Sequence, residues 1–243
     1  MRCPKLKKIR GVIFDYGGTL DTNGRHWAHV LWDGYCFADV SVSEDQFREA
    51  YVYGERALGR ERIIQPGDNY HTLLLKKVHQ EFQFLLKAGF LSFSDTECLK
   101  NERMIADFCY AEVQRVLSIS RQVLDILYQK FPLVLVSNFY GNMQAVLQDF
   151  KLENYFKNIV ESAVVGVRKP NPNIFRLGID ALQLPPGEVC VVGDSYEKDI
   201  LPAMSLGCHT VWFKGEEWKP SEHDDIVADT IITEIVQLPD VFW

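Results

Sequence analysis

Val12-Ile-Phe-Asp-Tyr-Gly-Gly-Thr-Leu20 combines an apolar run, an acidic side chain and a glycine pair within one short segment. The apolar run predicts a strand of a parallel sheet, because strands covered on both faces read as continuous hydrophobic stretches. The glycine pair predicts a turn directly beyond the strand. Asp15 is therefore expected at the carboxyl end of a strand, where open α/β sheets bind their ligands.

Further apolar runs alternate with helical segments from about residue 118 onward. Strands are expected at residues 133–136, 188–192, 208–213 and 230–232. A helix is expected from Pro172 to Leu182, since proline is favoured in the first turn, and Ser120 is expected to cap another helix. This alternation predicts an α/β fold with a Rossmann-like, doubly wound parallel sheet covered by helices on both faces.

The segment between the first strand and residue 118 has helical periodicity instead. Its apolar residues recur three and four positions apart, and potential capping boxes occur at Ser43 with Gln46 and at Ser94 with Glu97. The sequence thus predicts an all-helical domain of residues 21–117, inserted into an α/β core domain formed by residues 1–20 and 118–243.

Composition narrows the class of protein. The chain has 243 residues, of which 47% are hydrophobic and 24% are charged, and this is typical of a globular protein with a substantial core. A formal charge of -7 argues against a nucleic-acid polymer as partner. The six cysteines lack metal-ligand spacing and are expected to be reduced thiols. The basic amino end is not followed by an apolar signal region and no run reaches membrane-spanning length, so we expect a cytoplasmic protein without membrane contact.

Four segments, taken in chain order, resemble the motifs of the haloacid dehalogenase-like hydrolase superfamily. They contain the polar residues Asp15, Ser137, Lys169 and Asp194. The motifs stand here as Phe14-Asp-Tyr-Gly-Gly-Thr-Leu20, Val136-Ser-Asn138, Arg168-Lys-Pro-Asn-Pro172 and Val192-Gly-Asp-Ser-Tyr-Glu-Lys-Asp-Ile200. The helical insertion is similar to the superfamily's first type of cap, C1. Because magnesium-dependent phosphatases dominate the superfamily, the resemblance implies a Mg²⁺-dependent phosphohydrolase that acts on a small soluble phosphate ester.

The resemblance also implies a role for each residue. Asp15 would be the nucleophile and form an aspartyl-phosphate, which divides one difficult displacement into two. Thr19, Ser137, Asn138 and Lys169 would bind the phosphate, with Ser137 and Lys169 assisting catalysis. Asp15, the main-chain carbonyl of Gly17 and Asp194 would hold Mg²⁺, which favours a few hard oxygen ligands. Asp199 would support the site by orienting water or Lys169, although an acid near a helix N-terminus also has a purely structural explanation.

Gly17 departs from the superfamily's usual pattern. Phosphatases of the superfamily usually carry a second aspartate there, which protonates the leaving group and then activates water. General acid/base catalysis typically increases the reaction rate by about 10²–10⁴-fold. Its loss therefore predicts slow turnover or a preference for good leaving groups. Asp21 and His26 are candidates to replace the missing group.

Several alternatives stay open. A phosphate-binding regulatory module with little turnover would also fit Gly17. Haloacid dehalogenases and phosphonatases replace the same aspartate, but the former work without metal and the latter use a cap lysine, whereas Lys76, Lys77 and Lys87 are expected on the solvated face of a helix. The aromatic residues of the insertion fit either a substrate pocket or an ordinary helical core. The substrate and the oligomeric state are not determined by the sequence.

Overall fold

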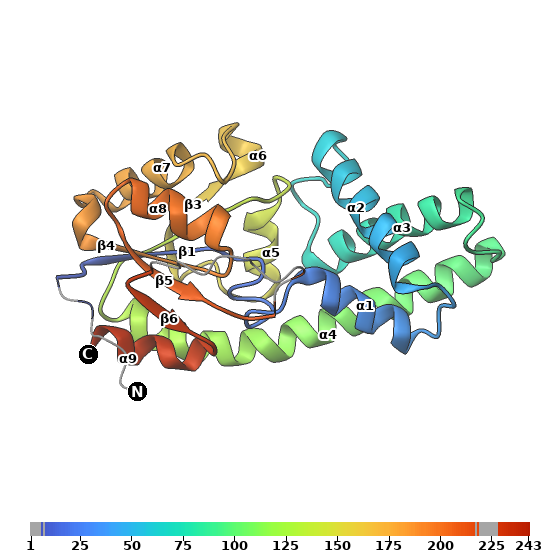
Figure 1. The fold of residues 1–243 in the computed structure, drawn as a ribbon, viewed down its shortest axis with the longest axis horizontal. Helices are drawn as coiled ribbons and strands as arrows, with labels where there is room; N and C mark the ends of the chain where they lie inside the picture. The colour runs from blue at the N-terminus through green and yellow to red at the C-terminus, as the bar shows by residue number, and fades with distance from the viewer. Residues whose placement is uncertain (1–5, 7, 217, 219–227) are drawn as a thin grey trace.

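A parallel sheet forms the core of the protein, with the strand order β3-β2-β1-β4-β5-β6. The computed structural model describes residues 6, 8–216, 218 and 228–243, so Cys3 and most of the basic amino end lie outside the described residues. Figure 1 shows the sheet between two layers of helices, with the helical insertion extending to one side. The strands are β1 (Gly11–Phe14), β2 (Leu133–Ser137), β3 (Phe156–Glu161), β4 (Val189–Gly193), β5 (His209–Phe213) and β6 (Thr230–Ile232).

The central strands are buried on both faces, as their continuous apolar sequences predict. Ile13, Val134 and Val191 pack on one face, together with apolar residues of α7 (Asn173–Leu182). Val12 and Phe14 join the other cluster, which includes the carboxyl-terminal half of α4 (Asp95–Tyr128). The doubly wound parallel sheet is thereby confirmed, and it places the ends of β1 and β4 next to each other. The remaining core helices are α5 (Met143–Asp149), α6 (Ser162–Val165), α8 (Leu201–Ser205) and α9 (Leu238–Phe242).

Strand β3 is absent from the sequence-based expectation. It lies at one edge of the sheet and pairs with β2 alone among the described strands. Lys157 and Asn158 are exposed within it, so its sequence has no continuous apolar run. An edge strand needs less apolar surface than a central strand. Because β3 contains polar residues, the search for apolar runs that identified the other five strands does not detect it.

The helical insertion consists of α1 (Trp27–Phe37), α2 (Glu44–Arg60), α3 (Tyr70–Lys87) and the amino-terminal half of α4, and we call this group the cap. Both expected capping boxes are present, Ser43 with Gln46 at α2 and Ser94 with Glu97 at α4. Apolar residues of these helices share one buried cluster with the sheet. Cap and core are therefore packed against each other, and Figure 1 shows α4 running beneath both.

The expectation that Ser120 begins a helix is wrong. Helix α4 continues without a break from Asp95 to Tyr128, over 34 residues, and Ser120 lies in its interior. The Ser120 hydroxyl is buried and donates a hydrogen bond to the carbonyl of Leu20 at 2.7 Å. The proposed boundary between residues 117 and 118 falls within this helix, so the division into domains stays a prediction. Among the described helices, none has both the length and the apolar character needed to cross a membrane.

Candidate active site

Asp15 directly follows β1 and lies at the carboxyl edge of the sheet. Its main-chain N–H donates to the carbonyl of Val192 at 2.9 Å, which holds the residue beside the end of β4. The side chain is buried, with 6% of the residue exposed. The sheet register thus brings Asp15 close to the polar residues that follow β4, as the sequence pattern predicts.

Lys169 reaches this edge from the loop before α7. Its Nζ atom lies 2.5 Å from Asp15 Oδ1 and 2.6 Å from Asp199 Oδ1. Burial alone would lower the pKa of Lys169, but the carboxylates of Asp15 and Asp199 outweigh it and raise the pKa above its usual value. Lys169 therefore stays cationic and can bind anionic oxygens beside Asp15.

Asp194 directly follows β4 and lies at the same edge of the sheet as Asp15 and Lys169. Thr19 Oγ1 donates to Asp194 Oδ1 at 3.2 Å and accepts from the Asp194 main-chain N–H at 3.1 Å. Asp15, Asp194 and Asp199 each offer a carboxylate oxygen, and these three oxygens lie within 4.8 Å of one another. Asp199 is also tied down by the Ser195 N–H, which donates to its Oδ2 at 3.1 Å.

The charges at this edge fit a divalent cation. Three carboxylates, of which Asp15 and Asp199 are buried and Asp194 is partly buried, face the ammonium group of Lys169, and this leaves an excess of negative charge. Burial, together with the charges of Asp15 and Asp199, raises the pKa of Asp194 well above the ordinary carboxyl value. A cation would relieve this repulsion, and hard oxygen donors in such a small set suit Mg²⁺. Both oxygens of Asp199 have partners, Lys169 and the Ser195 N–H, and Asp15 and Asp194 stay the predicted ligands.

The glycines after Asp15 differ sharply in the space around them. Gly18 has φ of +93°, and a Cβ there would lie 2.3 Å from Asp194 Oδ2. At Gly17 the nearest atoms to such a Cβ belong to Trp27, at 4.0 Å. Gly18 is therefore required by the close approach of the two segments, whereas Gly17 leaves open space where an acid/base side chain could stand.

Ser137 and Asn138 lie at the end of β2, where the sequence places them, and both line the cavity above Asp15. The side chain of Asn138 accepts from the Lys169 N–H at 2.8 Å and donates to the Lys169 carbonyl at 3.2 Å. Its amide thus positions the Lys169 loop, and any contact of Asn138 with phosphate stays a prediction.

The two candidates for the missing acid/base group lie in different surroundings. Asp21 is fully buried and accepts from the Gly18 N–H at 2.8 Å, from Trp27 Nε1 at 2.9 Å and from the Tyr70 hydroxyl at 3.0 Å. Burial raises its pKa to about 7, but the side chain does not line the cavity. It supports the loop after Asp15 rather than facing a ligand.

His26 does line the cavity. Its Nδ1 accepts a hydrogen bond from the Ala28 N–H at 3.2 Å. Burial, with added repulsion from Lys198 and Lys77, lowers its pKa to about 4. His26 is therefore neutral near pH 7, with its remaining ring nitrogen able to donate a hydrogen bond.

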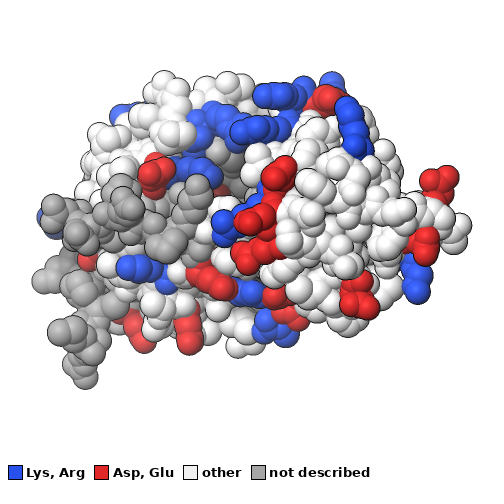
Figure 2. All heavy atoms as spheres, turned by 45° about the vertical axis from the view of Figure 1, so that its right-hand side comes forward, with Lys and Arg blue, Asp and Glu red and all other residues white. Residues whose placement is uncertain are grey.

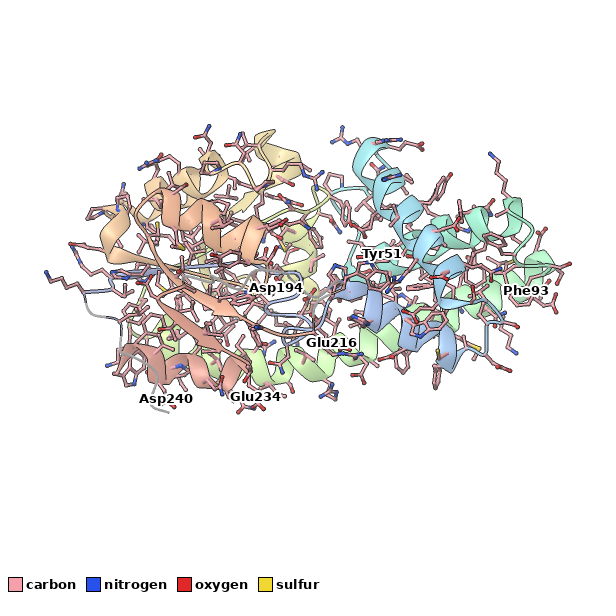
Figure 3. The ribbon with its side chains drawn as sticks, viewed as in Figure 1. Tyr51, Phe93, Asp194, Glu216, Glu234 and Asp240 are labelled. Atoms are coloured by element: carbon pink, nitrogen blue, oxygen red, sulfur yellow. The ribbon has the colours of Figure 1, made fainter. Side chains whose placement is uncertain are left out.

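A cavity of about 740 Å³ extends from Asp15 to the cap. Figure 3 shows Asp194 at the end of the sheet, Glu216 on the side of it toward the cap, and Tyr51 on α2 within the cap. In Figure 2, acidic and basic side chains lie next to each other at the junction of the two halves. The cavity lining includes residues from both halves, among them Trp27, Tyr51, Glu55, Lys77, Tyr140, Arg168 and Lys198.

The expectation that Lys77 lies on a solvated face is wrong. Its side chain is only 6% exposed and forms an ion pair with Glu55, whereas Lys87 is exposed and Lys76 binds Asp68 away from the cavity. The position of Lys77 depends on how α2 and α3 pack, and neighbouring lysines on one helix do not reveal which of them turns inward. The ion pair with Glu55 engages the Lys77 amine, which disfavours a nucleophilic role.

Comparison with known proteins identifies a family. A family model described as haloacid dehalogenase-like hydrolase matches residues 9–207. A haloacid dehalogenase-like hydrolase domain-containing protein 3 from Xenopus laevis is 26% identical over 87% of each chain. A glyceraldehyde 3-phosphate phosphatase from Pyrococcus furiosus is 36% identical over 37% of this chain, and the match covers 38% of that protein.

Solved structures agree on the fold. The magnesium-bound hydrolase YfnB from Bacillus subtilis aligns with a TM-score of 0.61 and 21% identity, over 96% of this chain and 97% of its own. A phosphatase from Thermococcus onnurineus aligns with a TM-score of 0.55 and 22% identity, over 96% of this chain and 97% of its own. A crystallised dehalogenase aligns with a TM-score of 0.65 and 16% identity, over 97% of each chain. These structures share the architecture of this chain.

Proposed function

The chain belongs to the haloacid dehalogenase-like hydrolases, and we propose that it is a Mg²⁺-dependent phosphatase that acts on small phosphate esters through a phosphorylated Asp15. The observation that carries the proposal is the meeting of Asp15 with Lys169 and Asp194 at one edge of the sheet. A nucleophilic carboxylate, a fixed ammonium group and an excess of buried acid are the requirements of phosphoryl transfer, where charge on the transferred oxygens must be neutralised.

In the first step, the Asp15 carboxylate attacks phosphorus and the leaving-group oxygen departs. Lys169 would bind the phosphoryl oxygens, with Ser137 as a further donor that lines the cavity. Thr19, which the sequence also proposes for phosphate binding, is fully buried and its hydroxyl donates to Asp194 instead. In the second step, water attacks the phosphorus of the aspartyl-phosphate, and Asp15 and inorganic phosphate are released. Asp199 would hold Lys169 in place during both steps through its ion pair.

Mg²⁺ bound by Asp15, Asp194 and the Gly17 carbonyl would neutralise phosphate charge and orient the ester. A dehalogenase reaction is the weaker alternative, because it needs no metal and gives the partly buried Asp194 carboxylate no counter-charge. Phosphonatase chemistry is also less well supported, since the Lys77 amine is engaged in an ion pair with Glu55.

The relatives support the reaction class. The match to the glyceraldehyde 3-phosphate phosphatase suggests a small phosphorylated substrate here. A phospholysine phosphohistidine inorganic pyrophosphate phosphatase from Xenopus laevis is 26% identical over 97% of this chain and 93% of its own. Both are phosphatases by name. We propose the same reaction, release of phosphate, for this chain, and we do not propose the same substrates.

The test is release of inorganic phosphate from p-nitrophenyl phosphate. We expect hydrolysis that requires Mg²⁺, is lost with EDTA and falls by at least about 10³-fold in Asp15→Asn, because the amide is a poor nucleophile. Asp180→Asn, a change at an exposed position on α7, is the control and should retain activity.

A regulatory module with little turnover is the second candidate, favoured by the open space at Gly17. It would give tight binding of phosphate esters without release of phosphate. Hydrolysis unaffected by Asp15→Asn or by EDTA would contradict the main proposal.

A further inference from the structure

The cap contributes one pair of opposite charges to the cavity, Glu55 from α2 and Lys77 from α3. The two side chains form an ion pair, and the hydroxyl of Tyr140, from the core loop after β2, lies 3.2 Å from each oxygen of the Glu55 carboxylate. The cluster therefore joins two cap helices and one core loop at the cavity wall.

Free hydrogen-bonding capacity remains on both charged groups. An ammonium has three donors and a carboxylate has about four acceptor positions, so the contacts with one another and with Tyr140 do not saturate them. Glu55 is the open member of the pair, because its side chain is 36% exposed against 6% for Lys77. Glu55 can therefore accept hydrogen bonds from a ligand in the cavity while its partner keeps it ionised.

Aromatic rings flank the pair. Lys77 Nζ lies 4.9 Å from the centre of the Tyr51 ring and 5.8 Å from that of Trp27. Both rings also line the cavity. They present flat apolar faces against which the C–H groups of a ligand can pack, next to the polar atoms of Glu55 and Lys77.

The charge balance selects the chemistry of the ligand. An anionic substituent placed against the pair would meet the Glu55 carboxylate, and a cationic one would meet the Lys77 ammonium. A hydroxyl group both donates and accepts, so neighbouring hydroxyls can satisfy both partners without disturbing the ion pair. The aromatic faces favour a carbon skeleton over a bare ion.

We propose that Glu55, Lys77 and Tyr140 form a subsite that binds the hydroxyl groups of a neutral polyol or sugar leaving group, with Tyr51 and Trp27 packing against its carbon skeleton. This inference rests on the proposed phosphatase function, since it assumes that phosphate binds at Asp15 and the remainder of the ester extends toward the cap. It makes Glu55 and Lys77 determinants of specificity, while the phosphoryl group is handled by the core.

The test compares two esters with the same carbon chain, ribitol 5-phosphate and n-pentyl phosphate. We expect kcat/KM for the ribitol ester to exceed that for the pentyl ester by about tenfold or more, because a site built to bind hydroxyls is left with unpaired polar groups by an analogue without them. Equal values for the two esters would overturn the proposal.

Variants connect this preference with the cluster. In Glu55→Gln/Lys77→Met, which removes both charges together, the ratio of the two kcat/KM values should fall toward one. In Tyr140→Phe, which leaves the ion pair in place, it should fall by about threefold to tenfold, the effect of one hydrogen bond. Lys76→Met is the matched control, because Lys76 neighbours Lys77 on α3 but pairs with Asp68 outside the cavity.

The outcomes separate this inference from the function on which it rests. Wild-type protein that releases no phosphate from p-nitrophenyl phosphate would remove the phosphatase itself. Normal release from that ester, with a ribitol-to-pentyl ratio that is unchanged in the double variant, would overturn the subsite alone. An equal fall of the ratio in Lys76→Met would also overturn it, since the effect would then not come from the cavity.

Discussion

At the scale of single residues, Gly17 is the position at which we expect the proposed phosphatase to be limited in expelling a leaving group. A side chain has room there, because a Cβ atom at this position would lie 4.0 Å from its nearest neighbours, the ring atoms of Trp27, and the backbone is outside the left-handed region. We expect Gly17→Asp to raise kcat for alkyl phosphates by about 10–10³-fold and to change aryl phosphates much less, because only the poor leaving groups need a proton.

The measurement for Gly17→Asp is a series of esters whose leaving groups differ in pKa. The wild-type rate should decline steeply along the series and the variant rate should decline less. Gly18→Asp is the contrasting variant, since its side chain would collide with Asp194. Equal wild-type rates across the series, with no gain in Gly17→Asp, would mean that another group already supplies the proton.

Glu81 is a buried acid outside the active site. It is fully buried in α3, accepts from the Tyr35 hydroxyl at 2.9 Å, and its Oε1 has no hydrogen-bond partner among the described residues. Burial raises its pKa to about 7, although Lys77 and Tyr35 oppose the shift. Because the raised pKa means that the folded state holds the proton more tightly, this residue should make the protein less stable as pH rises from about 4.5 to about 7.

The variant Glu81→Gln removes the ionisation. We expect it to be more stable than the wild type at pH 8 by roughly 2–3 kcal/mol, with the difference vanishing near pH 4.5, since both side chains are then uncharged. Urea unfolding at the two pH values measures this. Glu112→Gln, in a surface pair with Arg115, should change the unfolding free energy by less than about 0.5 kcal/mol at either pH. A difference for Glu81→Gln that does not depend on pH would contradict the assignment.

At the scale of elements, α4 links the cap to the loop that follows Asp15. The Ser120 hydroxyl binds the Leu20 carbonyl inside the protein. Ser120→Ala would leave that carbonyl buried without its partner, so we expect a loss of about 1–3 kcal/mol in the free energy of unfolding. Ser118→Ala serves as the control on the same helix, because its hydroxyl binds the Arg115 carbonyl at an exposed position. Equal effects of the two substitutions in urea titrations would contradict the prediction.

The elements also show what could be predicted from the sequence. The central strands, the capping boxes at Ser43 and Ser94 and the placement of Asp15 and Asp194 follow from local patterns, because apolar runs and turns fix where a parallel strand ends. Lys169 is identified only by the resemblance to the superfamily's motifs, since a lysine before proline usually lies in a solvated loop. Edge strand β3 is not predicted, because its exposed lysine and asparagine interrupt the apolar pattern of a strand. The continuity of α4 is not predicted either, because serines within it resemble the start of a new helix. The contact of Glu55 with Lys77 depends on the packing of two helices, and no local pattern contains it.

At the scale of the whole molecule, the cluster of Asp15, Asp194 and Asp199 should couple stability to magnesium. We expect the melting temperature to rise by about 5–10 °C at Mg²⁺ concentrations about 100 times the dissociation constant, and to return to its starting value with EDTA. Asp194→Asn should remove this response and should melt above the wild type in EDTA, because it relieves repulsion among the three clustered carboxylates.

Differential scanning calorimetry with and without Mg²⁺ measures both effects. Asp180→Asn, at an exposed position, should keep the full response to the ion. A wild-type melting temperature indifferent to Mg²⁺, or an Asp194→Asn protein that still responds, would contradict the expected ligand set.

The uninterrupted α4 has a consequence for modular engineering. At 1.5 Å per residue its 34 residues span about 50 Å, and its start is fixed by the box of Ser94 and Glu97 in the cap. Excision of residues 21–117 would leave the core with a shortened α4 whose first turn lacks that capping box. A cap grafted from another enzyme would need to supply the amino-terminal half of α4 itself. Recombination between relatives should therefore succeed only at junctions where the two halves continue as one helix with their buried faces aligned.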